Sequence, residues 1–208
     1  MTLKYEAILF DFDGVLVDSE PVHMSCWNQL LSENFGYTVA WEDFAPNCVG
    51  VHERGTVEWL VAQRHPPVPF ADLWDLYPRK KQLFRERMLL SGSVDDDVID
   101  LLKELRNDYL LAVVTSSGRV EVEPILESAG ILPLIQTAVY GSDVTNLKPA
   151  PDPYLLACRR IGTSNALVIE DSAAGVASGK AAGLDVLQIT SQREVGPTLR
   201  AHLAQSGS

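Results

Sequence analysis

Five short apolar runs, each followed by a polar turn, constrain the fold of this 208-residue chain more than any other feature. Apolar runs of four or five residues without polar alternation are typical of strands that are buried on both faces of a sheet. Helical patterns lie between most of them, and strands that alternate with helices form parallel sheets with right-handed crossovers. We therefore predict a parallel sheet with strands at Ala7–Phe10, Leu110–Val114, Ala138–Tyr140, Ala166–Ile169 and Val186–Ile189.

The helices expected around this sheet carry recognisable start and end signals. One has acidic residues at Asp95–Asp97 and basic residues at Lys103 and Arg106, which is the charge order that a helix dipole favours. Another opens at Asp152, as a cap, with Pro153 in its first turn, and runs through Arg160. Two further helices are expected at Glu121–Ala129, closed by Gly130, and at Ala173–Ala182, closed by Gly183. Only a polar C-terminal tail is expected after them.

Residues 18–90 interrupt this alternation of strands and helices because they contain no convincing strand pattern. A helix is expected after Ser19 and Pro21, and two more at Thr56–Gln63 and Pro78–Leu90, with a proline-rich stretch separating the last two. We predict an α/β core formed by residues 1–17 and 91–208, with residues 18–90 inserted as a helical domain after the first strand.

Composition excludes several classes of partner. The formal net charge is −11 and the pI is about 4.7, which argues against a general affinity for nucleic acid or for acidic membranes. No apolar run approaches the ~20 residues of a membrane span, and Asp11 interrupts the apolar N-terminal stretch too early for a signal peptide. Three widely spaced cysteines without a CxxC pair predict reduced thiols in a cytoplasmic protein.

Polar residues follow four of the predicted strands or turns, and in an open parallel sheet such positions meet at one edge. Asp11 and Asp13 stand two apart, so an extended backbone points both carboxylates the same way, and Mg²⁺ would relieve their repulsion. One carboxylate can attack phosphorus while the other transfers protons. Solvated turn aspartates are the alternative. The other three sites are Thr115 with Ser116, Lys148 before Pro149, and Glu170 with Asp171.

Each of those three sites also has a plain structural interpretation. Thr115 or Ser116 could donate to phosphoryl oxygens or could cap the next helix. Lys148 could neutralise an attacking carboxylate or simply lie at the surface. Asp171 could complete the Mg²⁺ site or cap the helix that follows. The convergence of all four sites, rather than any one of them, predicts a phosphate-processing centre.

The segments Asp11–Ser19, Val113–Ser117, Lys148–Tyr154 and Val168–Gly175 resemble the haloacid dehalogenase superfamily, in that family's order. The resemblance implies a Rossmann-like core with a helical cap inserted after the first motif. It implies Asp11 as nucleophile and Asp13 as general acid/base. It also implies Thr115 as a phosphoryl-binding residue and Lys148 as the residue that stabilises the charge of the phosphoryl group. It also implies Mg²⁺ held by Asp11, the carbonyl of Asp13 and Asp171, with Glu170 acting through water.

Within the superfamily, the chain is most similar to sugar-phosphate phosphatases and β-phosphoglucomutases. His23 corresponds to a cap-hinge histidine, Lys80 to a substrate-binding lysine, and Gly50–Arg54, with His52, to the cap's specificity loop. Ser116, His23, His52, Arg54 and Lys80 are thus the implied substrate-binding residues. However, Glu53 stands where the mutase has a phosphate-binding arginine, and Arg54 is one position late. This departure favours hydrolysis over mutation. His23 could equally be a partly exposed helix residue.

The expected function is therefore Mg²⁺-dependent hydrolysis of a small phosphorylated metabolite, a sugar phosphate above all, by a monomer or weak homodimer. A phosphosugar mutase is the closest alternative. A phosphoreceiver domain also uses acids, Thr or Ser and Lys-Pro, but its acidic pair comes before the phosphorylated aspartate, and here the nucleophile comes first. A non-catalytic binding protein of the same fold is disfavoured because Asp11, Asp13 and Lys148 are all present.

Overall fold

The computed structural model describes residues 3–91 and 94–206, and the described chain divides into two compact units. One unit comprises the residues up to Asp18 together with those from Val94 onward, and the other is Ser19–Ser91. Residues 1–2, 92–93 and 207–208, which belong to the predicted core range, lie outside the described residues.

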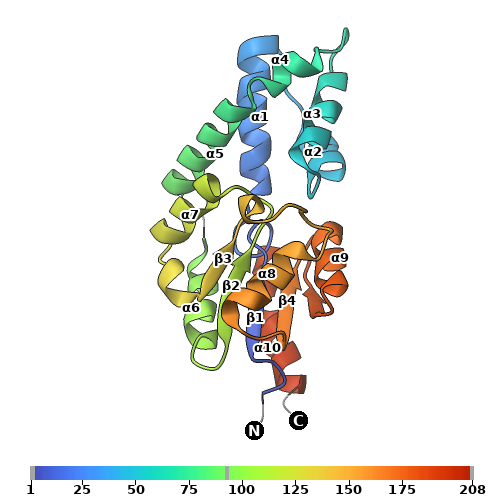
Figure 1. Ribbon diagram of the computed structural model, residues 1–208. Coiled ribbons are helices and arrows are strands. Elements are labelled where there is room, and N and C mark those ends of the chain that lie inside the picture. The colour runs from blue at the N-terminus through green and yellow to red at the C-terminus, as the bar shows by residue number, and fades with distance from the viewer. Residues whose placement is uncertain (1–2, 92–93, 207–208) are drawn as a thin grey trace. The chain divides into compact units, whose positions relative to one another are not determined.

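A five-stranded parallel sheet lies at the centre of the first unit, which confirms the predicted α/β fold (Figure 1). Its strand order is β3-β2-β1-β4-β5. Ala7 of β1 pairs in register with Leu110 of β2 on one side and with Ala166 of β4 on the other, so β1 is the central strand. The strands are β1 (Ala7–Phe10), β2 (Leu110–Val114), β3 (Thr137–Val139), β4 (Ala166–Glu170) and β5 (Asp185–Gln188).

Burial differs between the central and the edge strands. Every residue of β1 and β4 is buried, as predicted for the apolar runs Ala7–Phe10 and Ala166–Ile169, and Glu170 at the end of β4 is buried as well. The same expectation is wrong for β5, where Asp185 and Gln188 are exposed and the two residues between them are half-buried. Because β5 is an edge strand with a neighbour on one side only, it can carry polar residues that a central strand could not.

Helices flank this sheet, and α8 packs on one face of it (Figure 1). Leu9 of β1 and Val114 of β2 share a buried apolar cluster with Tyr154 and Ala157 of α8. The α-helices of this unit are α6 (Asp96–Leu105), α7 (Arg119–Ser128), α8 (Asp152–Ile161), α9 (Ala173–Ala181) and α10 (Val195–Ser206). Short 3₁₀ turns are η1 (Leu132–Leu134), η2 (Gly141–Asp143) and η3 (Gln192–Glu194).

Two helix predictions for this unit are wrong. The C-terminal segment is the helix α10 and not a polar tail, because Val195 and Leu199, four residues apart, are both fully buried and anchor one face of it. Asp152 is the first helical residue of α8 and not its cap. Pro151 occupies the cap position, and its side chain makes no capping hydrogen bond.

The second unit is helical, and none of its described residues lies in a strand. Its helices are α1 (Glu20–Phe35), α2 (Trp41–Cys48), α3 (Glu53–Ala62), α4 (Phe70–Trp74) and α5 (Tyr77–Ser91). α2 and α4 were not predicted: α2 contains Pro46, and α4 has only five residues, too few for a helical period to show. Within residues 3–91 and 94–206, no helix combines the length and the apolarity required to cross a membrane.

Candidate active site

Asp11 stands where β1 ends, and strand pairing continues through it. Its backbone N–H donates to the carbonyl of Ile169 in β4 over 3.0 Å. Three residues later the chain turns at Gly14, whose φ is 75° and where a Cβ atom would lie only 1.9 Å from Oδ2 of Asp171. The loop after β1 is thus packed against the loop after β4, and only glycine permits both that φ and that approach.

Lys148 joins the carboxylates of these two loops. Its ammonium donates to Oδ1 of Asp11 over 2.7 Å, to Oε1 of Glu170 over 2.6 Å and to the carbonyl of Val114 over 2.9 Å. Three donors on one ammonium are therefore matched by acceptors at the ends of three neighbouring strands. The Lys148–Pro149 peptide bond is cis. Sequence positions as distant as 11 and 170 are brought together at the carboxyl edge of the sheet.

Burial and charge change the acidity of this group. Burial is the main cause that raises the pKa of Asp11 well above its usual value; the Lys148 ammonium opposes it, and the charges of Glu170 and Asp13 add to it. Burial lowers the pKa of Lys148, but the charges of Asp11 and Glu170 outweigh that effect and raise it. The raised pKa of Lys148 favours its ammonium form, and this one ammonium lies between two carboxyl groups.

Asp13 lies beside the loop after β2. The hydroxyl of Ser117 donates to Oδ2 of Asp13 over 2.9 Å, and the backbone N–H of Ser117 donates to Oγ1 of Thr115 over 3.0 Å. Thr115 is buried, whereas the neighbouring Ser116 is exposed. Ser117 was missed by the sequence reasoning, although its place two residues after Thr115 was a usable signal.

Oxygen atoms of Asp11, Glu170 and Asp171 all lie within 4.8 Å of one another. Hard oxygen donors are the ligands that Mg²⁺ prefers, so the carboxylates of Asp11 and Asp171 fit the predicted metal, while the oxygens of Glu170 accept hydrogen bonds from protein donors. The carboxylate of Asp13 is outside this set and accepts a hydrogen bond from Ser117, and the metal contact expected of its carbonyl stays a prediction.

The predicted substrate residues of the second unit fall into two places. Lys80, on α5, is 2% exposed and donates to Glu53 and, over 2.6 Å, to Nδ1 of His23, whose ring stacks on Phe84 with centroids 4.1 Å apart. Oε2 of Glu53 also accepts from the indole of Trp27 over 3.2 Å. Glu53 was singled out from the sequence only as a departure, and its pairing with Lys80 was missed.

His52 and Arg54 lie instead on the exposed start of α3. Nδ1 of His52 accepts from the backbone N–H of Arg54 over 3.2 Å and so caps the helix. The Arg54 guanidinium bonds Glu58 over 3.2 Å and lies 4.9 Å from the ring centre of Phe70. Both side chains thus have local partners, and their predicted contact with a substrate stays a prediction.

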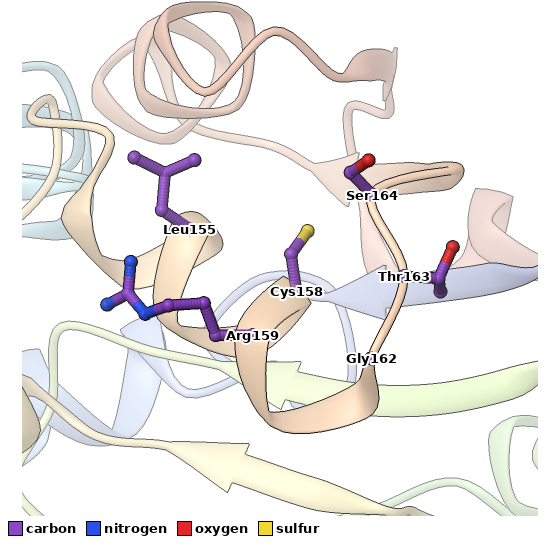
Figure 2. A pocket seen from close by; sticks show the side chains of 6 residues that line it. All are labelled: Leu155, Cys158, Arg159, Gly162, Thr163 and Ser164. Carbon is purple, nitrogen blue, oxygen red and sulfur yellow. The ribbon is translucent and has the colours of Figure 1, made fainter.

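A pocket of about 330 Å³ opens at the C-terminal end of α8 (Figure 2). Leu155, Cys158 and Arg159 line it from the helix, and Gly162, Thr163 and Ser164 line it from the turn that follows. None of the predicted site residues lines it, so this pocket is distinct from the carboxylate cluster.

The haloacid dehalogenase-like hydrolase family matches residues 8–189. A fructose-1-phosphate phosphatase of Escherichia coli is 28% identical, over 89% of this chain and 97% of its own length. A phosphorylated carbohydrates phosphatase of Thermotoga maritima is 30% identical, over 86% of this chain and 82% of its own. The crystal structure of CbbY from Rhodobacter sphaeroides in complex with phosphate superposes with a TM-score of 0.72 at 26% identity, over 88% of this chain and 84% of that one.

Proposed function

The chain belongs to the haloacid dehalogenase-like hydrolase family and is a phosphohydrolase, and on that premise we propose that it hydrolyses a small sugar phosphate with Mg²⁺ through a phosphorylated Asp11. The relatives named for fructose 1-phosphate and for phosphorylated carbohydrates support this substrate class. The single observation that carries the mechanism is the buried Lys148 ammonium 2.7 Å from Oδ1 of Asp11.

Asp11 is the nucleophile in this proposal. Its carboxylate oxygen forms a bond to phosphorus while the bond from phosphorus to the sugar oxygen breaks. Lys148 opposes the effect of burial by favouring the ionised carboxylate and holds it in place, and its charge also offsets that of the phosphoryl group. Water then attacks phosphorus, the bond to Asp11 breaks, and inorganic phosphate leaves.

Asp13 moves the protons. In the first step its carboxyl group protonates the departing sugar oxygen, and in the second the resulting carboxylate accepts a proton from the attacking water. The hydrogen bond from Ser117, 2.9 Å long, fixes the orientation of this carboxylate. Because the same group gives and then regains one proton, the two steps balance.

Thr115 supplies a phosphoryl-binding hydroxyl, and Ser116, exposed beside it, supplies a second donor. Asp11 and Asp171 would hold Mg²⁺ with the carbonyl of Asp13, and the carboxylate of Glu170 lies next to theirs. Mg²⁺ in this place would act as a Lewis acid that offsets the negative charge of the carboxylates and of the phosphoryl oxygens.

We assign the unit Ser19–Ser91 the role of a cap that selects the substrate, with His23 and Lys80 as its candidate residues. A reducing, cytoplasmic setting is proposed as well, because Cys26, Cys48 and Cys158 are all free and buried. A monomer or weak homodimer remains the expected assembly.

The test is phosphate release from fructose 1-phosphate and from other sugar phosphates, with Mg²⁺ and with excess chelator. Asp11→Asn should lower kcat by at least about 10³-fold, since it removes the nucleophile. Asp108→Asn, at an exposed turn, is the matched control and should leave kcat unchanged. Full activity of Asp11→Asn, or full activity in chelator, would contradict the proposal.

The same assay separates hydrolase from mutase. Glu53 stands where the resemblance places the phosphate-binding arginine of a mutase, and it pairs with Lys80, so that arginine is missing as a partner for a second phosphate. Glucose phosphates should therefore yield free phosphate. Accumulation of an isomer without free phosphate would replace the hydrolase with the mutase.

A further inference from the structure

The carboxylate of Glu170 is fully buried at the end of β4, and the protein itself saturates both of its oxygens. Oε1 accepts from the Lys148 ammonium over 2.6 Å and from the Tyr154 hydroxyl over 2.8 Å. Oε2 accepts from Ser172 Oγ over 3.1 Å and from the backbone N–H groups of Asp171 and Ser172 over 3.1 and 3.2 Å. A carboxylate offers about four lone-pair sites, and all are in use.

The space around this carboxylate is closed as well. A Cβ atom at Gly175, in the first turn of α9, would lie 1.7 Å from Oε1 of Glu170. The backbone of α9 therefore forms one wall against the carboxylate, and Lys148 and Tyr154 reach it from elsewhere. A carboxylate enclosed in this way can orient its neighbours, because it has almost no freedom of its own.

Tyr154 touches both members of the Lys148–Glu170 pair. It is fully buried on α8, its hydroxyl bonds Glu170, and the centre of its ring lies 5.0 Å from the Lys148 ammonium. If the hydroxyl were lost, Oε1 would keep the ammonium as its only side-chain donor. The ammonium would then be drawn toward Glu170 and away from Oδ1 of Asp11.

We propose that Tyr154 is a positioning residue for the reaction: its hydroxyl shares Oε1 of Glu170 with Lys148 and thereby keeps the ammonium aimed at Asp11. This proposal rests on the proposed function, because it takes Asp11 as the nucleophile. Tyr154 itself touches neither substrate nor any reacting atom. A purely structural role would need only its ring, which lies in the apolar cluster beneath the sheet.

The experiment compares Tyr154→Phe with Tyr5→Phe, and both keep the ring. Tyr5 is a close match: it is 3% exposed and its hydroxyl donates to the carboxylate of Asp185 over 2.8 Å, but it precedes β1 and so lies at the opposite end of the strand from Asp11. Steady-state kinetics with p-nitrophenyl phosphate and saturating Mg²⁺ give kcat and KM, and thermal unfolding gives the folded fraction.

We expect Tyr154→Phe to lower kcat about tenfold and to leave KM within about twofold, because a hydrogen bond to a charged group has an effect of that size. Tyr5→Phe should leave both constants unchanged. A kcat for Tyr154→Phe within twofold of wild type, a change confined to KM, or a loss that only follows the folded fraction would overturn the proposal.

A double-mutant cycle tests the route through Glu170. Glu170→Gln should lower kcat as well, and adding Tyr154→Phe to it should have less than about a twofold further effect, because coupled residues are not additive. A full further tenfold loss would refute that route. If wild type releases no phosphate, or if Asp11→Asn stays active, the proposed function fails and this inference with it. An inactive Asp11→Asn beside a fully active Tyr154→Phe would overturn only this inference.

Discussion

Each unit of the molecule buries one lysine, and the two lysines have opposite surroundings. Lys148 faces two carboxylates, Asp11 and Glu170, with a carbonyl as its third partner. Lys80 faces one carboxylate, Glu53, and the neutral nitrogen acceptor of His23. Aromatic rings lie close to both ammonium groups.

The difference lies in the balance of charge. Around Lys148 the carboxyl groups outnumber the ammonium, and Asp13 and Asp171 lie close by, so the cluster fits the site of a further cation. The Lys80–Glu53 pair is balanced internally. A buried lysine by itself therefore does not indicate catalysis. An excess of carboxyl groups over ammonium groups, held in place by the fold, is the feature that fits a metal and a charged substrate.

The largest effect that would sharpen this contrast is the loss of Lys148. Lys148→Met should lower kcat by about 10³-fold, because Asp11 and Glu170 then repel each other and no fixed cation faces the nucleophile. Steady-state phosphate release measures it. Lys103→Met is the control: its ammonium pairs with Asp100 at the surface, and kcat should not change. A loss below tenfold for Lys148→Met would remove the catalytic distinction between the two lysines.

Lys80→Met should act on stability instead. Breaking a buried ion pair costs about 3–5 kcal/mol, and since the Glu53 side chain is 22% exposed we expect about 2–3 kcal/mol of unfolding free energy. Urea unfolding measures this value. Adding Glu53→Gln should recover part of it, because no uncompensated charge then remains. Arg79→Met, which removes a surface pair on the same helix, should cost under about 0.5 kcal/mol. Unchanged stability in Lys80→Met would mean that the pair contributes nothing.

The smallest expected effect is on the pH dependence of the stability that the Lys80–Glu53 pair contributes. Burial raises the pKa of Glu53, but the charge of Lys80 and the hydrogen bonds from Lys80 and Trp27 outweigh that effect, so its pKa is lowered from 4.5. Its stabilising effect is therefore present above pH 4.5 and is lost as the pH falls through the lower, folded-state pKa. Because glutamine keeps an oxygen that accepts from the Lys80 ammonium, Glu53→Gln should be less stable than wild type by only on the order of 1 kcal/mol at pH 7. That difference should shrink below pH 4.5 in urea titrations, and a difference that grew on acidification would reverse the sign of the argument.

The sheet and the meeting of the four loops could be predicted from the sequence because both depend on local patterns. An uninterrupted apolar run predicts a buried strand, and parallel strands bring their carboxyl ends to one edge, so Asp11 and Lys148 meet although 137 positions separate them. The roles of these residues remain predictions. Distances between their atoms follow from packing of the whole sheet, which no local pattern encodes.

The missed features depend on which surfaces face each other. Tyr154 reads as one more residue of an amphipathic helix until α8 is placed on the sheet, where its hydroxyl meets Glu170. Glu53 and Lys80 lie on different helices, 27 positions apart, and no spacing rule connects them. The helix α10 was missed because two buried residues, Val195 and Leu199, are too few to stand out in a polar segment.

The central place of β1 also has consequences for the order in which the chain becomes functional during synthesis. β1 is made first, yet its neighbours β2 and β4 begin at Leu110 and Ala166, so its two edges must wait for more than half of the chain. Pairing over such separations is entropically costly and slow. The compact unit Ser19–Ser91 shortens the effective loop between β1 and β2 if it folds first. On the proposed function, catalysis would need residues from Asp11 to Asp171 and would begin only after β4 has paired with β1.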